Sequence, residues 1–150
     1  MTMLKRCSDI EVYLSELLSQ ITKANGYETD IGLHRVYRGK RKIEDAEVPC
    51  AVVLTGEDRV GDQGRDDVQV MQDFVLGGYH ECDPDQPNDV AHAIVRDIVK
   101  AVYSTGINWQ RRVVKVSYMG KDIGPRADGM PIVFAIVHIT VNYSQELAIG

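Results

Sequence analysis

The sequence predicts an α+β protein: a mixed, largely antiparallel sheet of about five strands with two main helices packed on it. Its 150 residues are 44% hydrophobic and 26% charged, values typical of one globular domain spanning residues 1–150. Two segments carry apolar residues at helical spacing, and five others are alternating or continuously apolar over strand-like lengths. Their order is α-β-β-β-α-β-β, in which two amphipathic helices can cover one face of a sheet.

The first helix is predicted from Ser8 to about Asn25. Ser8 and Glu11 have the spacing of a capping box, in which the two residues satisfy each other's backbone N–H groups. An apolar stripe at helical spacing follows, formed by Ile10, Leu14, Leu17, Leu18 and Ile21. Asn25-Gly26 tolerates a positive φ and should end the helix. We expect the stripe to pack in the core.

Three strands are predicted next. Asp30–Gly39 is typical of a short strand, and Cys50–Thr55 is a β-branched run expected to be covered on both faces, with Cys50 as a small buried hydrophobe. From Val68 to Leu76 every second residue is apolar except Gln72, an alternation typical of a strand with one buried face. The strand is expected to stop at Gly77-Gly78.

An acidic, proline-containing link, Tyr79–Pro87, leads into a second helix predicted from Asn88 to Tyr103. Gly106 should end that helix, and Trp109, the sole tryptophan, is expected to anchor the edge of the core.

Two further strands are predicted at Val113–Met119 and Ile132–Tyr143. The last is apolar on both faces in its first half, whereas three residues make one face of its second half polar: His138, Thr140 and Asn142.

Three charged loops are predicted, at Arg38–Glu47, Gly56–Asp67 and Gly120–Gly129. The middle one has no apolar periodicity but contains three glycines and seven charges, which predicts a mobile loop. Charged loops on a rigid frame are typical of a subunit that contacts other proteins.

Composition excludes several classes of protein. A net charge of −5 argues against a dedicated duplex-DNA binder, which would need a concentrated basic face. Three irregularly spaced cysteines form no disulfide framework and favour a reducing compartment. We expect no secretory signal, because acidic residues interrupt the first residues, and no membrane span, because the longest apolar run is too short.

Sequence motifs for chemistry are nearly absent. Neither a phosphate-binding glycine loop nor a nucleophile elbow is present, so we expect no enzyme activity and no cofactor. One enzyme-like cluster could gather ligands around a divalent cation: His80, Cys82, Asp83, Asp85 and Asp89. The favoured interpretation is that these acids complement the dipole of the second helix. A small metal-dependent hydrolase using residues 80–89 is the less favoured alternative.

A basic cluster, Arg38 to Lys42, could contact nucleic acid. Acidic residues follow within a few positions, and Tyr37 is the one aromatic residue beside it. A solvated loop or a protein interface is therefore the favoured interpretation.

Several segments follow one another along the chain: Ile21-Thr22-Lys23-Ala24-Asn25-Gly26-Tyr27, Thr29-Asp30-Ile31-Gly32, Val36-Tyr37-Arg38-Gly39, Glu44-Asp45, Val48-Pro49-Cys50-Ala51-Val52-Val53, the central helix and Phe134-Ala135-Ile136-Val137-His138-Ile139-Thr140-Val141. In this order they resemble the tail terminator (tail completion) proteins of long-tailed bacteriophages. The resemblance covers nearly the whole chain.

The resemblance implies a mixed sheet flanked by helices that assembles as a hexameric ring. Such a ring caps the tail tube, stops its polymerisation and presents the surface that joins the head, with DNA only as passing cargo. The expected partners are copies of itself, the tail tube protein and a head-completion or neck protein. The expected location is the head-proximal end of the tail in the virion, after assembly in the bacterial cytoplasm.

Six basic residues are the candidate subunit or tube interface: Arg38, Arg41, Arg59, Arg65, Lys121 and Arg126. Two other interpretations stay open beside the tail terminator. One is a head–tail joining protein of the neck. The other is a small module that binds a host or phage protein through the apolar stripe of the first helix.

Overall fold

The computed structural model describes residues 3–104, 111–124 and 129–147. In these ranges two α-helices and five strands follow one another in the predicted order, which confirms the α+β class. Helix α1 spans Cys7–Ser19 and α2 spans Pro87–Tyr103. The strands are β1 (Val36–Arg38), β2 (Cys50–Gln63), β3 (Asp67–Glu81), β4 (Lys115–Ile123) and β5 (Ile132–Glu146), with short 3-10 turns at Lys23–Asn25 and Asp45–Glu47.

The strands form one mixed sheet in the order β1-β2-β3-β5-β4. Only β1 and β2 are parallel, and the other three pairs are antiparallel, as predicted. Strand β3 pairs with β5 along its whole length, from Asp67 opposite Glu146 to Glu81 opposite Ile132. Strands β2 and β4 flank this central pair, and β1 covers only the beginning of β2.

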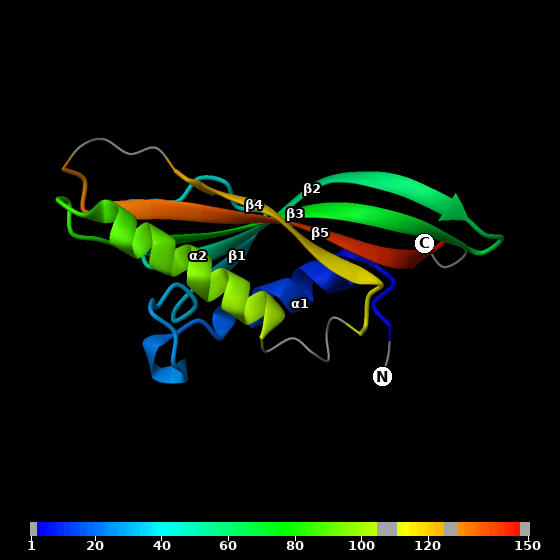
Figure 1. Ribbon diagram of the computed structural model, residues 1–150, viewed down its shortest axis with the longest axis horizontal. Helices are drawn as coiled ribbons and strands as arrows, with labels where there is room; N and C mark the ends of the chain where they lie inside the picture. The colour runs from blue at the N-terminus through cyan, green and yellow to red at the C-terminus, as the bar shows by residue number, and fades with distance from the viewer. Residues whose placement is uncertain (1–2, 105–110, 125–128, 148–150) are drawn as a thin grey trace.

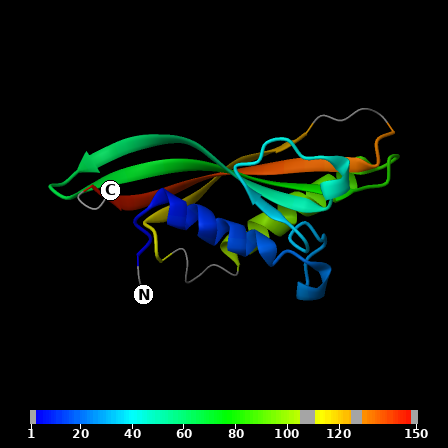
Figure 2. The same cartoon turned by 180° about the vertical axis from the view of Figure 1, so that it is seen from behind.

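Both helices lie on the same face of the sheet (Figures 1 and 2). Helix α1 packs against β1 and β2, while α2 packs mainly against β5 and β3. The predicted apolar stripes face inward, and their largest side chains are fully buried: Ile10, Leu14, Leu18, Ile94 and Ile98. No helix in the described ranges combines the length and apolar character needed to cross a membrane.

Beyond the helices, the outer ends of β2, β3 and β5 project along the long axis of the molecule (Figure 1, right; Figure 2, left). We call residues 56–67 the arm. It comprises the outer part of β2, the turn and the first residue of β3. The prediction of a mobile loop at Gly56–Asp67 is therefore wrong, because strand pairing continues to Gln63 opposite Val68.

Glycines explain that error. Register shifts in β2 between Thr55 and Asp58 and between Val60 and Gln63 are β-bulges, and each contains a glycine, Gly56 or Gly61. The predicted end of β3 at Gly77-Gly78 is wrong for the same reason, since the strand continues through these glycines to Glu81. A Cβ on Gly78 would approach Ile31 Cδ1 at 2.8 Å, so the glycine there is required by close packing under the helices rather than by a strand end.

The predicted ends of the first helix are also wrong. Arg6 occupies the N-cap without a side-chain hydrogen bond, and Ser8 lies inside the first turn. The carboxylate of Glu11 instead accepts hydrogen bonds from Arg38 Nε (2.9 Å) and Thr55 Oγ1 (2.7 Å), which connect α1 to β1 and β2. The helix ends at Ser19, and Gly26, with φ of 89°, ends the following 3-10 turn.

The remaining boundaries differ by smaller amounts. The strand predicted at Asp30–Gly39 is reduced to three residues, because a turn precedes it in which Leu33 N–H donates to Asp30 O at 3.0 Å. Strand β4 continues to Ile123, into the loop predicted at Gly120–Gly129. The predictions for Gly106 and Trp109 lie outside the described residues.

Candidate functional site

The arm is the most exposed regular structure in the described part of the chain. Every residue from Gly56 to Asp67 is exposed, although residues 50–53 of the same β2 strand are buried. Gly64 N–H donates to Asp67 O at 2.9 Å and closes the turn. Alternating residues Val68 and Val70 of β3 are buried immediately behind the tip. The arm is thus an ordered extension of the sheet rather than an irregular loop.

A polar network fixes the base of the arm to the centre of the sheet. Arg59 binds Asp73 through two hydrogen bonds, of 2.9 and 3.1 Å, in a bidentate arrangement. Thr140 Oγ1 donates to the same Asp73 carboxylate at 2.7 Å. The hydrogen bond from Arg59 lowers the pKa of Asp73, and the same contact raises the pKa of Arg59. Three neighbouring strands, β2, β3 and β5, are joined here.

The network borders a groove of about 360 Å³ on the sheet face opposite the helices. The groove is lined by Val75, Met119 and His138 beside the network residues. His138 Nε2 lies 2.9 Å from Asp122 Oδ2 across β5 and β4. Apolar side chains continue along this face, where the rings of Tyr79 and Phe134 stack at 4.5 Å. This face carries half-buried side chains, including Leu54, Val75, Phe134 and Ile136.

A second charged surface lies in the other half of the molecule. Residues 35–42, which we call the basic segment, contain five basic and no acidic residues. Three of these residues form exposed ion pairs: Arg38 with Glu11, Lys40 with Glu47, and Lys42 with Glu44. Lys40 Nζ also lies 4.3 Å from the centroid of the Tyr37 ring. Arg35 donates to the Ala46 carbonyl oxygen at 3.1 Å.

The six predicted interface residues do not form one cluster. Arg38 and Arg41 belong to the basic segment, Arg59 and Arg65 to the arm, and Lys121 to β4 on the opposite edge of the sheet. Arg126 lies outside the described residues. Two of the six are engaged within the subunit: Arg38 by Glu11 and Arg59 by Asp73. Arg41, Arg65 and Lys121 are exposed.

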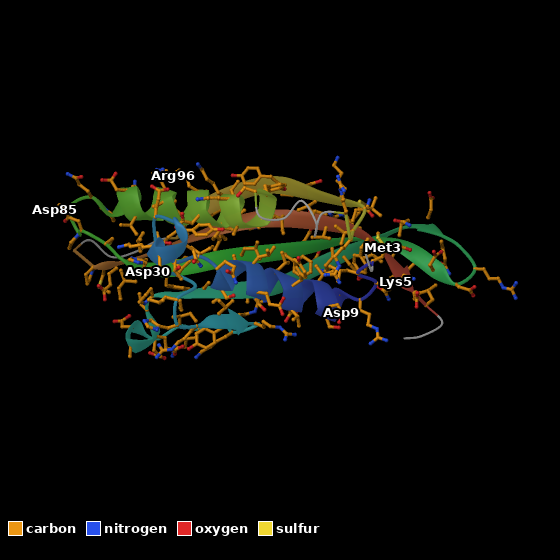
Figure 3. The ribbon with its side chains drawn as sticks, turned by 90° about the horizontal axis from the view of Figure 1, so that it is seen from below. Met3, Lys5, Asp9, Asp30, Asp85 and Arg96 are labelled. Atoms are coloured by element: carbon orange, nitrogen blue, oxygen red, sulfur yellow. The ribbon has the colours of Figure 1, made fainter. Side chains whose placement is uncertain are left out.

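The acidic link lies at the end of the molecule opposite the arm, where Figure 3 shows Asp85 and Arg96. His80, Cys82, Asp83 and Asp89 line a cleft of about 650 Å³ there. His80 Nδ1 lies 2.8 Å from Glu81 O.

Metal ligation finds no geometric support in this cleft. The described residues contain no group of three or more His, Cys, Asp or Glu side chains arranged to hold a metal ion. One carboxylate oxygen of Asp83 accepts a hydrogen bond from Asp85 N–H at 3.0 Å. Asp83 is therefore part of the turn that precedes α2. Arg96 crosses the cleft to bind Glu28 with two hydrogen bonds, of 2.7 and 2.9 Å.

The thiols of Cys7 and Cys50 are not activated. All three are free thiols, and burial raises the pKa of Cys7 and of Cys50 to about 11. Both therefore remain protonated at neutral pH, whereas a nucleophilic cysteine needs a lowered pKa.

Two polar residues of structural importance were missed by the sequence analysis. Asp97 is 2% exposed on α2 and accepts hydrogen bonds from Glu28 N, Thr29 N and Thr29 Oγ1, at 3.0, 2.8 and 2.6 Å. Its position within the apolar face of α2 was an available signal, because a buried acid must be hydrogen-bonded. Asp73 had a weaker signal: it alternates with the apolar residues of β3 and so belongs to the opposite face.

Comparison with models of protein families and with curated protein sequences finds no match to this chain.

Proposed function

We propose that this protein is a structural virion-assembly subunit: a tail terminator that caps the tail tube of a long-tailed bacteriophage as a ring. In this role six copies end polymerisation of the tube and provide the surface that joins the head. The partners are other copies of the chain, the tail tube protein and a head-completion protein, and DNA passes through the lumen without being bound. The protein acts at the head-proximal end of the tail, after assembly in the bacterial cytoplasm.

The observation that carries this proposal is the arm. The arm adds little to the core, because every residue from Gly56 to Asp67 is exposed. An ordered projection of this kind is suited to reach a neighbouring molecule. The resemblance of the sequence segments to tail terminator proteins supplies the identity of the assembly.

The site geometry also favours an assembly role over catalysis. In the described residues the thiol groups of Cys7 and Cys50 have raised pKa values, and the cleft by the acidic link has no metal-holding group. Charged side chains are concentrated on two separate exposed surfaces, the arm and the basic segment, where they can contact other molecules.

The direct test is a tube polymerisation assay. Tail tube protein of the same phage is polymerised with and without the purified protein, and tube lengths are measured by electron microscopy. We expect shorter tubes with a ring at one end when the protein is present. Tubes of unchanged length and without end structures would contradict the proposal.

A head–tail joining protein of the neck is the alternative within the same class of ring. Complementation separates the two. In a phage that lacks its tail terminator, expression of this protein should restore tails of normal length. If over-long tails persist while phage with a defective neck protein are rescued, the joining role replaces the terminator role.

A further inference from the structure

We propose that the arm of one copy docks on the basic segment, residues 35–42, of a second copy, so that copies join head to tail. This inference rests on the proposed function, in which copies form a ring, and it names the two surfaces that meet. A contact between two different patches is heterologous, and it gives a closed ring when the rotation between successive copies closes.

The arm is acidic. The arm contains five acidic and two basic residues, a net charge of −3. Arg59 is already bound by Asp73, which lies outside the arm. Arg65 therefore remains as the one arm base not held in this way. The acids of the arm are exposed: Glu57, Asp58, Asp62, Asp66 and Asp67.

The basic segment is strongly positive, because five basic residues lie within eight positions. Acids of the same copy neutralise part of it, since Arg38, Lys40 and Lys42 have carboxylate partners. Arg41 is exposed and has no ion pair within the described residues, and the side chain of Lys42 is 89% exposed with its partner at 3.8 Å. An exposed pair at that separation is weak, so the charges of Arg41 and Lys42 remain available to a partner.

The arm and the basic segment lie in different halves of the molecule. The arm projects at one end of the long axis, whereas the segment from β1 to the Asp45–Glu47 turn lies in the other half of the molecule (Figures 1 and 2). One copy therefore cannot bring its own two surfaces together. A second copy displaced along the long axis can, and the opposite net charges favour that arrangement over contacts between like surfaces.

Each surface also offers an apolar side chain for the centre of the contact. Val60 on the arm is 64% exposed, and Leu33, two residues before the basic segment, is 50% exposed. Backbone pairing along the arm is not the mode of contact, because β2 is bulged twice there and carries charges, two features that block strand addition at an edge. Side chains therefore make the contact.

The test uses two double variants of the full chain. Asp62→Lys with Asp66→Lys changes the arm from −3 to +1, and Arg41→Glu with Lys42→Glu changes the basic segment from +5 to +1. Each pure variant should lose at least tenfold in association constant by sedimentation velocity at low ionic strength. An equimolar mixture should form heterodimers but no rings, because the unchanged arm (−3) of the segment variant meets the unchanged basic segment (+5) of the arm variant, whereas the two altered surfaces are both +1.

Two controls separate charge complementarity from loss of folding and from net charge. Glu16→Lys with Asp85→Lys makes the same overall charge change as the arm variant, +4, at exposed positions outside both surfaces and should assemble as the wild type does. Arg65→Glu makes the arm more acidic and should not weaken association. Thermal unfolding followed by circular dichroism should give the same Tm for all these variants.

The outcomes are distinguishable. If wild type assembles and the variants assemble equally well, the arm–segment contact is wrong while the proposed function stands. If both variants lose assembly and their mixture forms no heterodimer, charge complementarity between these surfaces is wrong. A wild type that stays monomeric at every concentration, with and without tube protein, overturns both proposals.

Discussion

The helix-covered half of the sheet and the arm are built from the same strands but differ in what their residues do. In the covered half, β2 and β3 bury Val53 and Phe74 completely beneath the helices. Along the arm the same two strands bury no residue from Gly56 to Asp67. One half therefore stabilises the fold, and the other presents charges to the outside. If this division is correct, substitutions in the two regions must affect different measurements.

The largest expected effect is in the core of the covered half. Ile98→Asp places an unpaired charge at a fully buried position of α2, which should cost about 4 kcal/mol or more and unfold the domain. The matched substitution Val60→Asp on the arm, at a position 64% exposed, should change stability by less than about 0.5 kcal/mol. Urea unfolding followed by circular dichroism compares the two. Equal losses of unfolding free energy in the two variants would contradict the division between a stabilising covered half and an arm that adds little to stability.

A backbone comparison should give the next largest effect. A Cβ on Gly32 would lie 2.1 Å from the Leu18 carbonyl oxygen, so Gly32→Ala must displace the end of α1 and should cost about 3 kcal/mol. A Cβ on Gly61 in the arm meets nothing closer than 3.5 Å, and Gly61→Ala should be nearly neutral. Thermal melts of the two variants test this, and a neutral Gly32→Ala would show that the α1 contact is not tight.

Asp97 tests a polar element of the covered half. Asp97→Asn turns one acceptor of the buried carboxylate into a donor facing a backbone N–H of Glu28 or Thr29, which should cost about 2 kcal/mol. Asp89→Asn, on the exposed first turn of the same helix, is the control and should cost about 0.5 kcal/mol through the helix dipole. Equal effects of the two changes in chemical denaturation would refute the anchoring role.

The smallest effect is expected at the junction of the two regions. The pKa of Asp73 is lowered in the folded state, chiefly by the hydrogen bond from Arg59. Its stabilising contribution is therefore present above the ordinary carboxyl pKa and is lost as pH falls through the lowered value. Because the pair is partly exposed, Asp73→Asn should cost less than about 1 kcal/mol at pH 7. The difference from wild type, measured by urea unfolding, should shrink as pH falls below the ordinary carboxyl pKa and vanish once Asp73 is protonated; a difference that grows on acidification would contradict the assignment.

Local sequence patterns were sufficient for the fold class because the buried side chains follow simple periods. The stripe of α1 and the alternation of β3 from Val68 to Leu76 correspond directly to faces that the structure buries. These patterns arise from contact with the core, so they are recorded in the sequence wherever an element has one buried face.

The arm was mispredicted because it has no such face. Its glycines and charges indicate a loop when local propensity is considered alone, and two β-bulges interrupt the pairing with β3 that orders it. Strand β3 is in turn held by β5, 79 residues later along the chain (Asp67 opposite Glu146). The interface hypothesis was affected in the same way. Basic residues could be identified from the sequence, but the carboxylates that engage Arg38 and Arg59 come from α1 and β3.

The central claim is that the arm serves assembly and not folding. Sedimentation velocity of the Asp62→Lys/Asp66→Lys protein beside wild type, at equal concentration and with matched Tm, tests it most directly. We expect ring-sized particles for wild type and monomers for the variant. Ring-sized particles for both proteins would contradict it.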